Sequence, residues 1–271
     1  MVKLQSDEAP HPQPLPTRGR GEFKARCVFV LSTIFSISSA ALADEPCHGP
    51  SLGTVEVVAV RDGRTLHLAD GRELRLVGIE AGDDARPALH DLIGGRPLRL
   101  ERLGPETDRY GRLTAFAFAG DSPLPLQIAL VEQGRARVSA RLGDTACAAL
   151  LKAAEGRARA AARGLWTDPN FAPLSAEDLP RLAAENGRFA LVEGKVLSVR
   201  ESGATIYVNF GRRWTRDFTV TILKRQQRTF AASGLEPKRL EGRRVRVRGW
   251  LERRSGPIIV ADAPEQIELI E

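Results

Sequence analysis

Apolar and polar residues alternate in short runs over most of the chain that follows residue 52. Such runs, separated by turns that contain glycine, are typical of strands in a small barrel or meander. They predict five strands, at GTVEVVAV (53–60), RTLHLAD (64–70), RELRLVGIE (72–80), RPLRLERL (96–103) and residues 113–119. Helical periodicity predicts three helices, at residues 85–93, at 126–133 and in the alanine-rich stretch 146–166. The pattern therefore predicts an α+β fold, mainly β, in which a barrel carries three helices.

A second series of strands follows an interruption at residues 169–186. That segment, PNFAPLSAEDLPRLAAEN, contains three prolines and is the best candidate for a linker. The later strands are predicted at residues 189–200, 205–210, 217–223, 243–251 and 257–260. Five strands with a helical or irregular insertion before the fourth match a second small barrel of the OB type. A generic small β domain over residues 187–271 is the alternative.

The longest apolar run lies near the N-terminus and predicts a secretory signal. It spans CVFVLSTIFSISSAALA (27–43), follows Lys24 and Arg26, and ends in Ala41-Leu42-Ala43, a small-residue cleavage pattern. The run is short and rich in serine, which argues against the alternative of a membrane anchor. We therefore expect residues 1–43 to be removed, with the mature chain secreted or periplasmic and without a stable membrane anchor. The proline-rich first 22 residues suggest that the true start codon lies nearer Lys24.

Composition adds one covalent prediction and one on charge. Of three cysteines, cleavage removes Cys27 and leaves Cys47 and Cys147, which an oxidising compartment would join in a disulfide; two unrelated buried thiols are the alternative. Apolar residues make up 42% of the chain, which is ordinary for soluble domains. The net charge is +6, and residues 187–271 hold 17 Lys and Arg against 10 Asp and Glu. The basic excess therefore lies in the C-terminal part.

Five motifs, in order across residues 52–168, resemble the thermonuclease family, which is also called staphylococcal-nuclease-like. They are Val60 followed by Asp62-Gly63-x-Thr65, RLVGIEAG (75–82), DRYGRLTAF (108–116), LQIALVEQGRARV (126–138) and ARAAARGLW (158–166). The resemblance implies a five-stranded OB barrel with three helices. It also implies calcium-assisted hydrolysis of the phosphodiester backbone of DNA and RNA, in which a water attacks phosphorus in line.

The resemblance assigns roles to four residues. Arg75 and Arg112 match the two arginines that contact the phosphate, where bidentate guanidinium geometry is hard to replace. Glu80 stands at the position of an acidic metal ligand, one methylene longer than the usual aspartate. Asp83 stands at the position of the catalytic base, one methylene shorter than the usual glutamate. Each of the two arginines, taken singly, is also compatible with an ordinary surface charge.

Arg64 departs from the family, which has another acidic metal ligand at this point of the turn. A guanidinium held about 4 Å from a divalent ion would be repelled by roughly 8 kcal/mol at an effective dielectric of ~20. Calcium is the cofactor that the resemblance implies, and Arg64 argues against its binding in the standard manner. Arg64 would instead turn outward or add a third positive group to the phosphate.

Two arginine-rich stretches in the C-terminal part suggest a surface for nucleic acid, single-stranded rather than duplex. In GRRVRVRGW (242–250) the period of two sends Arg244, Arg246 and Arg248 to one face of a strand. FGRRWTRDF (210–218) places Trp214 among Arg212, Arg213 and Arg216. Arginines contact a backbone while an aromatic side chain stacks on bases. A solvated strand face, in a chain that uses arginine throughout, is the alternative.

The sequence therefore leads to a leading hypothesis and two rivals. The leading hypothesis is an exported nuclease-like phosphodiesterase with a degenerate calcium site and a C-terminal domain that grips nucleic acid. One rival is a catalytically inactive protein that retains the fold and binds nucleic acid or acts as an envelope scaffold. In the other, the C-terminal barrel binds protein or peptidoglycan.

Overall fold

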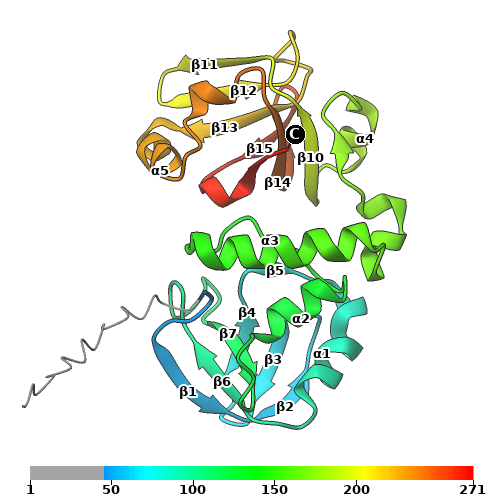
Figure 1. The fold of residues 1–271 in the computed structure, drawn as a ribbon, viewed down its shortest axis with the longest axis vertical. Helices are drawn as coiled ribbons and strands as arrows, with labels where there is room; N and C mark the ends of the chain where they lie inside the picture. Colours follow the sequence, from blue (N-terminus) through cyan, green and yellow to red (C-terminus); the bar gives the residue numbers. More distant parts are fainter. Residues whose placement is uncertain (1–45, 271) are drawn as a thin grey trace, which may run out of the picture. The chain divides into compact units, whose positions relative to one another are not determined.

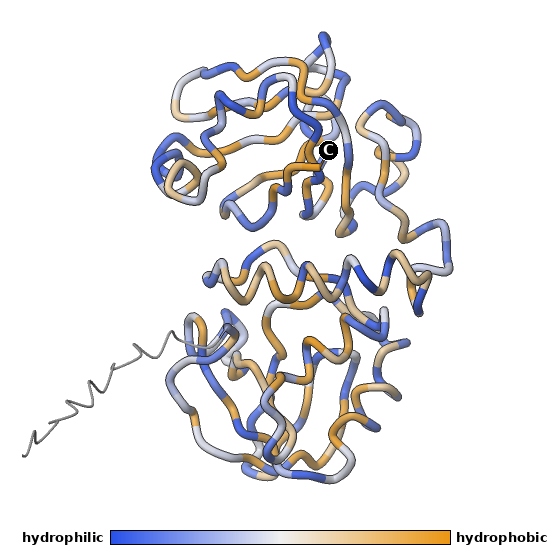
Figure 2. The backbone as a smooth tube through the Cα atoms, in the orientation of Figure 1, coloured by the Kyte–Doolittle hydropathy of each residue, from blue (hydrophilic) through white to orange (hydrophobic). Residues whose placement is uncertain are grey.

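The computed structural model describes residues 46–270 (Figure 1). The predicted signal segment and start codon lie outside the described residues. Within residues 46–270, no helix combines the length and apolar character that a membrane crossing requires. Polar and apolar positions alternate along much of the backbone (Figure 2). Strands predominate and helices are fewer, which confirms the mainly β, α+β class.

The first barrel is a six-stranded sheet in the order β1-β6-β7-β4-β3-β2. Its strands are β1 (Ser51–Val55), β2 (Val57–Val60), β3 (Thr65–Leu68), β4 (Glu73–Leu76), β6 (Leu98–Glu101) and β7 (Leu113–Ala119). Only Glu56 separates β1 from β2, so the two ends of the sheet are joined and the barrel closes. All pairings are antiparallel except that of β4 with β7.

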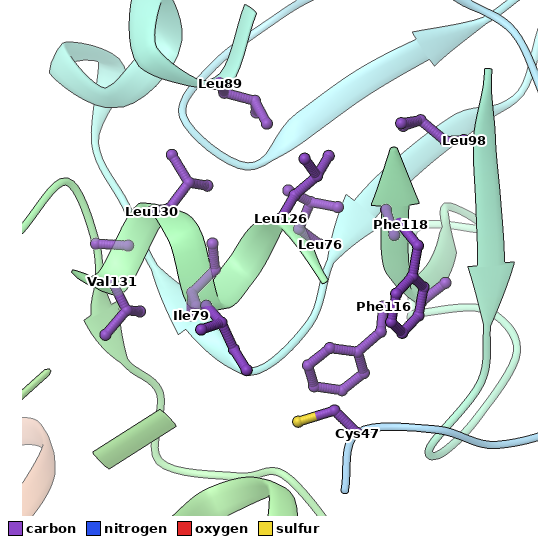
Figure 3. Close-up of a cluster of buried hydrophobic side chains, with 14 of the residues drawn as sticks. Cys47, Leu76, Ile79, Leu89, Leu98, Phe116, Phe118, Leu126, Leu130 and Val131 are labelled. Atoms are coloured by element: carbon purple, nitrogen blue, oxygen red, sulfur yellow. The ribbon is translucent and has the colours of Figure 1, made fainter. Parts of the chain in front are cut away.

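Three helices pack on the first barrel, as the pattern predicted: α1 (Arg86–Ile93), α2 (Leu126–Glu132) and α3 (Thr145–Ala160). Figure 3 shows side chains from α1, α2 and the strands meeting in one core that contains Phe116 and Phe118. The two-residue strands β5 (Ile79–Glu80) and β8 (Arg137–Val138) form a small separate pair. That pair carries Glu80 to the edge of the core, because Ile79 is buried and anchors it.

A disulfide joins Cys47 to Cys147, which confirms the predicted pairing over the alternative of two separate thiols. Cys47 precedes β1, and Cys147 lies in the first turn of α3, where its amide donates to the side chain of the N-cap residue Asp144. The bond closes a stretch of 100 residues and therefore fixes the start of the barrel to its longest helix.

The second barrel repeats the connectivity of the first. Its strands are β10 (Phe189–Lys195), β11 (Ser198–Ser202), β12 (Thr205–Asn209), β13 (Thr219–Leu223), β14 (Arg244–Arg253) and β15 (Pro257–Val260), in the order β11-β12-β13-β15-β14-β10. Only Val196 and Leu197 separate β10 from β11, and their amides donate to Arg243 on one side and Asn209 on the other. The chain therefore turns a corner there and closes the ring. α5 (Gln227–Ala232) precedes the fourth strand of the series, and β16 (Ile267–Leu269) adds to β14.

The proline-rich segment 169–186, predicted as a linker, is ordered and packs on the second barrel. It contains β9 (Leu174–Ser175), which pairs in parallel with β10, and α4 (Leu179–Ala184), which Asp178 caps. Leu174 and Leu182 are buried in the second core. The prolines stand at turns and in the first turns of helices, where a missing N–H costs little.

Candidate functional site

Charged side chains gather where the turn before β3 meets β4 and β5. Asp62 and Arg64 lie in that turn, Arg75 is on β4, and Glu80 ends β5. Gly63 allows the approach, because a Cβ at this position would lie 2.1 Å from the carbonyl oxygen of Gly82. A side chain at residue 63 would therefore push the turn away from the segment that follows Glu80.

Arg75 is half-buried and held at one end of the cluster. Its Nη1 donates to the Thr65 hydroxyl at 2.8 Å and lies 3.6 Å from a carboxylate oxygen of Asp62. Burial lowers the pKa of Arg75, and the positive charges of Arg64 and Arg112 lower it further. The negative charge of Asp62 opposes this effect. Arg75 therefore feels the positive charge of both Arg64 and Arg112, an environment that favours an anion beside it.

Arg64 does not turn outward to solvent. Its Nη1 lies 2.5 Å from a carboxylate oxygen of Glu80 and donates to the backbone carbonyl of Ile79 at 2.8 Å. Burial raises the pKa of Glu80, although the charges of Arg64 and Arg75 lower it in part. Glu80, which the sequence predicted as a metal ligand, is thus engaged by Arg64, the residue predicted to disturb the metal site.

Arg112 comes from a distant loop and is fixed by its own turn. Its Nε donates to Asp108 at 2.8 Å, its Nη2 lies 2.7 Å from the same oxygen, and its guanidinium lies 5.1 Å from the centre of the Tyr110 ring. Burial alone would raise the pKa of Asp108, but hydrogen bonds from Arg112 and from backbone amides lower it overall. Asp108 therefore orients the arginine whose charge is felt at Arg75.

Asp62 is a member of the cluster that was not singled out from the sequence. Burial alone would raise its pKa, but hydrogen bonds from the Arg64 amide and the Thr65 hydroxyl, with the charge of Arg75, lower it overall. The signal was present in the Asp62-Gly63-x-Thr65 turn, which served only to recognise the family. Its carboxylate positions the turn and one arginine at the same time.

Asp83 is not brought into this cluster by any direct contact. It begins a short 3-10 helix (Asp83–Ala85) and is exposed. Within residues 46–270, no hydrogen bond or ion pair involves its carboxylate. Its role as general base therefore stays a prediction.

A cleft of about 410 Å³ opens beside the cluster. Arg64 and Glu80 line one end, and Arg137 on β8, directly opposite Glu80 in the strand pair, lines the wall. Arg137 donates to the carbonyl of Phe189 at 2.8 Å, and burial lowers its pKa. Sequence analysis missed Arg137 because strands of two residues carry no periodic pattern.

The donor set of this cluster does not fit a calcium ion. Calcium takes six to eight oxygen ligands, whereas Arg64 engages the Glu80 carboxylate, and Asp62 accepts from a backbone amide and faces Arg75. In the part of the chain that the structure describes, no group of three or more His, Cys, Asp or Glu side chains has the arrangement of a metal site.

The structure corrects the prediction for two arginines of the second barrel. Val245 and Val247 face the core and the arginines face the other way, as the period of two requires. However, Arg248 is only 1% exposed, with hydrogen bonds to Glu155 on α3, Glu268 on β16 and the carbonyl of Val138. Its burial prevents contact with a nucleic acid, so this assignment was wrong.

Arg246 is likewise engaged, 2.7 Å from Glu193 and 3.6 Å from Glu268. Its guanidinium is therefore already neutralised by two carboxylates, which removes the charge that the sequence prediction relied on. Arg244, at the start of β14, is exposed. Of the three arginines on this face, Arg244 alone keeps the surface position that was expected.

The loop between β12 and β13 keeps the character expected of a binding surface. Arg212, Arg213 and Arg216 are exposed, and Trp214 is 65% exposed. Asp217 shapes the loop by accepting from the amide of Arg213 at 2.7 Å. Among the described residues, no ion pair involves the side chains of these three arginines.

Comparison with known families agrees with the first barrel. Residues 69–168 match the family model of the staphylococcal nuclease homologues, a range that includes Arg75, Glu80, Asp83 and Arg112. Residues 69–168 are therefore similar to a domain of the staphylococcal nuclease type. The matched range begins after Arg64 and ends before the second barrel. No curated protein matches the chain.

Proposed function

We propose that the first barrel binds a phosphodiester of DNA or RNA and hydrolyses it, with Arg75 and Arg112 as the groups that stabilise the transition state. The observation that carries the proposal is the pairing of β4 with β7, which sets Arg75 opposite Thr114, two residues after Arg112, while Asp62 lies 3.6 Å from Arg75. A phosphate between Arg75 and Arg112 would relieve their mutual repulsion and receive donors on its equatorial oxygens.

In this proposal each side chain has a defined task. Attack by water forms a new P–O bond while the P–O bond to the leaving sugar oxygen breaks, and that oxygen takes a proton from solvent. The added negative charge on the non-bridging oxygens receives donors from the guanidiniums of Arg75 and Arg112. When a phosphate binds, Arg64 leaves the carboxylate of Glu80 and becomes the third guanidinium that donates to the phosphate. Asp83 is exposed and follows Glu80 by three residues in the sequence. Its carboxylate accepts the proton of the attacking water. Asp62 and Asp108 hold two of the arginines in position and are positioning residues.

Export to an oxidising compartment is part of the proposal. The signal-like run at 27–43 and the disulfide between Cys47 and Cys147 support it. The exposed loop with Arg212, Arg213 and Trp214 would add electrostatic grip on the same polymer.

The decisive experiment compares Arg112→Ala with the unchanged mature chain on end-labelled single-stranded DNA, with calcium and with chelator. We expect the variant to lose about 10²- to 10³-fold in rate, the usual effect of removing one transition-state donor. Arg72→Ala is the matched control, because Arg72 lies in a turn of the same barrel and pairs only with Asp70 in the described part of the chain. Equal rates for Arg112→Ala and the unchanged chain would overturn the assignment.

A second candidate is a protein that binds nucleic acid without cleaving it. The pairing of Arg64 with Glu80 favours it, because that contact occupies a carboxylate that hydrolysis would otherwise use. The same experiment separates the two, since retention of the labelled strand without products, in both calcium and chelator, would establish the second.

A further inference from the structure

We infer that the cleft beside the cluster is a stacking site for unpaired nucleobases, which restricts the proposed activity to single strands. The inference rests on the proposed function and names its substrate class. For brevity this cleft, defined by Arg64, Glu80, Arg137, Phe171, Phe189 and Trp250, is called the aromatic cleft.

The aromatic cleft has two chemically different walls. Arg64, Glu80 and Arg137 come from the first barrel and belong to the charged cluster or lie against it. Phe171 comes from the connecting segment, and Phe189 and Trp250 come from β10 and β14 of the second barrel. The cleft is therefore continuous with the phosphate cluster at one end and lined by aromatic rings at the other.

Trp250 has the exposure and support of a stacking platform. It is 50% exposed, although its neighbours Gly249 and Leu251 on β14 are buried. The Phe189 ring supports it from one side, at 6.1 Å between ring centres and an angle of 74°. An indole that is half-exposed offers a flat surface to a planar ligand.

Arg137 fixes a positive charge at the back of the cleft. Its guanidinium lies 5.3 Å from the centre of the Phe171 ring and 5.1 Å from that of Phe189, and it donates to the Phe189 carbonyl. Such contacts with two rings hold the guanidinium in one place. A ligand that combines a flat base with a phosphate matches this combination of groups.

The aromatic cleft selects single strands over duplexes by stacking on bases, and not by its net charge. Arg188 also lines the cleft, but Asp84 and Glu185 balance the added charge. Glu185 lies 3.6 Å from Arg188, so these charges are already partly satisfied. A nucleic acid duplex hides the faces of its bases, whereas a single strand exposes them to aromatic side chains. The cleft volume is also that of a small-molecule pocket, which suits one or two nucleotides.

The test measures binding without requiring cleavage. Labelled phosphorothioate oligomers, which resist hydrolysis, are titrated with the mature chain in chelator, as single-stranded DNA, single-stranded RNA, duplex DNA and a strand of abasic sites. We expect Trp250→Ala to weaken binding of both single strands by about 5- to 150-fold, the range for loss of one stacked base. Duplex and abasic strands should bind the variant and the unchanged chain equally.

Two further variants separate stacking from folding. Trp250→Phe keeps an aromatic face and should restore most of the affinity. Leu197→Ala is the matched control, since Leu197 is 46% exposed on the second barrel and does not line the cleft. Unchanged binding of single strands by Trp250→Ala, or an equal loss for duplex and abasic strands, would overturn the inference. Cleavage is measured separately, on the unmodified end-labelled strand used for Arg112→Ala. Absence of cleavage there by the unchanged chain, with the Trp250 effect intact, would overturn the proposed hydrolysis and leave the stacking site standing.

Discussion

The two barrels of this chain have the same strand connectivity but carry different side chains at corresponding places. In each, a divided first strand closes the ring, the third and fifth strands pair in parallel, and a helix precedes the fourth. The first residue of the second strand is a threonine in both, Thr65 and Thr205. It pairs with Arg75 in the first barrel and with Leu223 in the second. The strand connectivity therefore does not determine the chemistry of this edge of the sheet. The residue opposite the threonine does, because an arginine can bind an anion and a leucine cannot.

The two barrels also differ in how they use arginine. Arg75 and Arg112 are half-buried, and each approaches a single carboxylate. Arg248 is fully buried and meets two carboxylates and a carbonyl. A guanidinium that is buried between carboxylates is not available to a ligand, whereas one that is partly exposed and has donors to spare can bind one. Substitutions in the two barrels test this distinction.

Arg248→Met should be the most destabilising change. It leaves Glu155, which is only 1% exposed, without its main positive partner, and breaking a buried pair in this way costs about 3–5 kcal/mol. The measurement is the free energy of unfolding in urea. The double variant Arg248→Met with Glu155→Gln is the control, because glutamine still accepts from the Val138 amide without a buried charge. If the double variant is no more stable than the single one, the cost comes from packing rather than charge.

The same arginine shows how far sequence reasoning extends. Alternation correctly separated Val245 and Val247 from the arginines of β14, because the period of two is a property of any strand. It did not show what covers the other face. Glu155 is 93 residues away on a helix, and no local pattern couples the two. Strand periodicity therefore predicts the face of the strand on which a side chain lies. Whether that face is buried depends on packing between elements that are distant in the sequence.

The candidate site was predictable to a similar extent. Arg75 and Arg112 were found because whole motifs surround them. The contact of Arg64 with Glu80 was not, since the sequence allowed the arginine to turn outward or toward a phosphate. Trp250 was missed because an aromatic residue in a strand is usually part of a core. Only the structure shows that Trp250 is half-exposed and lines the cleft formed by the connecting segment and both barrels.

Arg75→Lys should reduce the proposed cleavage by about 10²- to 10³-fold, because lysine cannot form the bidentate contact of a guanidinium. The charge is retained, so stability should change little, and urea unfolding will show whether it does. Leu223→Met, at the corresponding place in the second barrel, is the matched control and should leave the rate unchanged. A rate for Arg75→Lys equal to that of the unchanged chain would show that the position contributes only charge.

Arg64→Asp should create a dependence on calcium. The change releases Glu80 from its arginine and adds a carboxylate to the turn that already contains Asp62. Bound calcium would then stabilise the fold, by about 2.7 kcal/mol at a concentration 100 times the dissociation constant. Thermal unfolding with calcium and with chelator measures the effect, and Arg64→Ala controls for loss of the arginine alone. An equal calcium shift in the unchanged chain would mean that Arg64 does not prevent metal binding.

Acid should weaken the contact between Glu268 and Arg248. Burial alone would raise the pKa of Glu268, but the charge of Arg248 and its hydrogen bond lower the pKa below the usual 4.5. The stabilisation is therefore complete above pH 4.5 and is lost as the pH falls through the folded pKa. Glu268→Gln should cost about 1.5–3 kcal/mol at pH 7, the value of a hydrogen bond to a charged group. Unfolding free energies of the two chains should converge in acid, and a constant difference across the series would refute the assignment.

The loop between β12 and β13 should give the smallest effect. Arg213→Ala removes one exposed guanidinium that has no ion pair in the described part of the chain. If it contacts a phosphate, the slope of log affinity against log salt for single-stranded DNA should fall by about 0.7, the contribution of one released counterion. The matched control in the same barrel is Arg246→Ala, which should leave the slope unchanged because carboxylates already neutralise that arginine. A slope that falls equally in both variants would contradict the distinction between satisfied and available arginines. A fall in Arg213→Ala alone would place the electrostatic contact of the second barrel on this loop, with β14 serving to hold the barrels together.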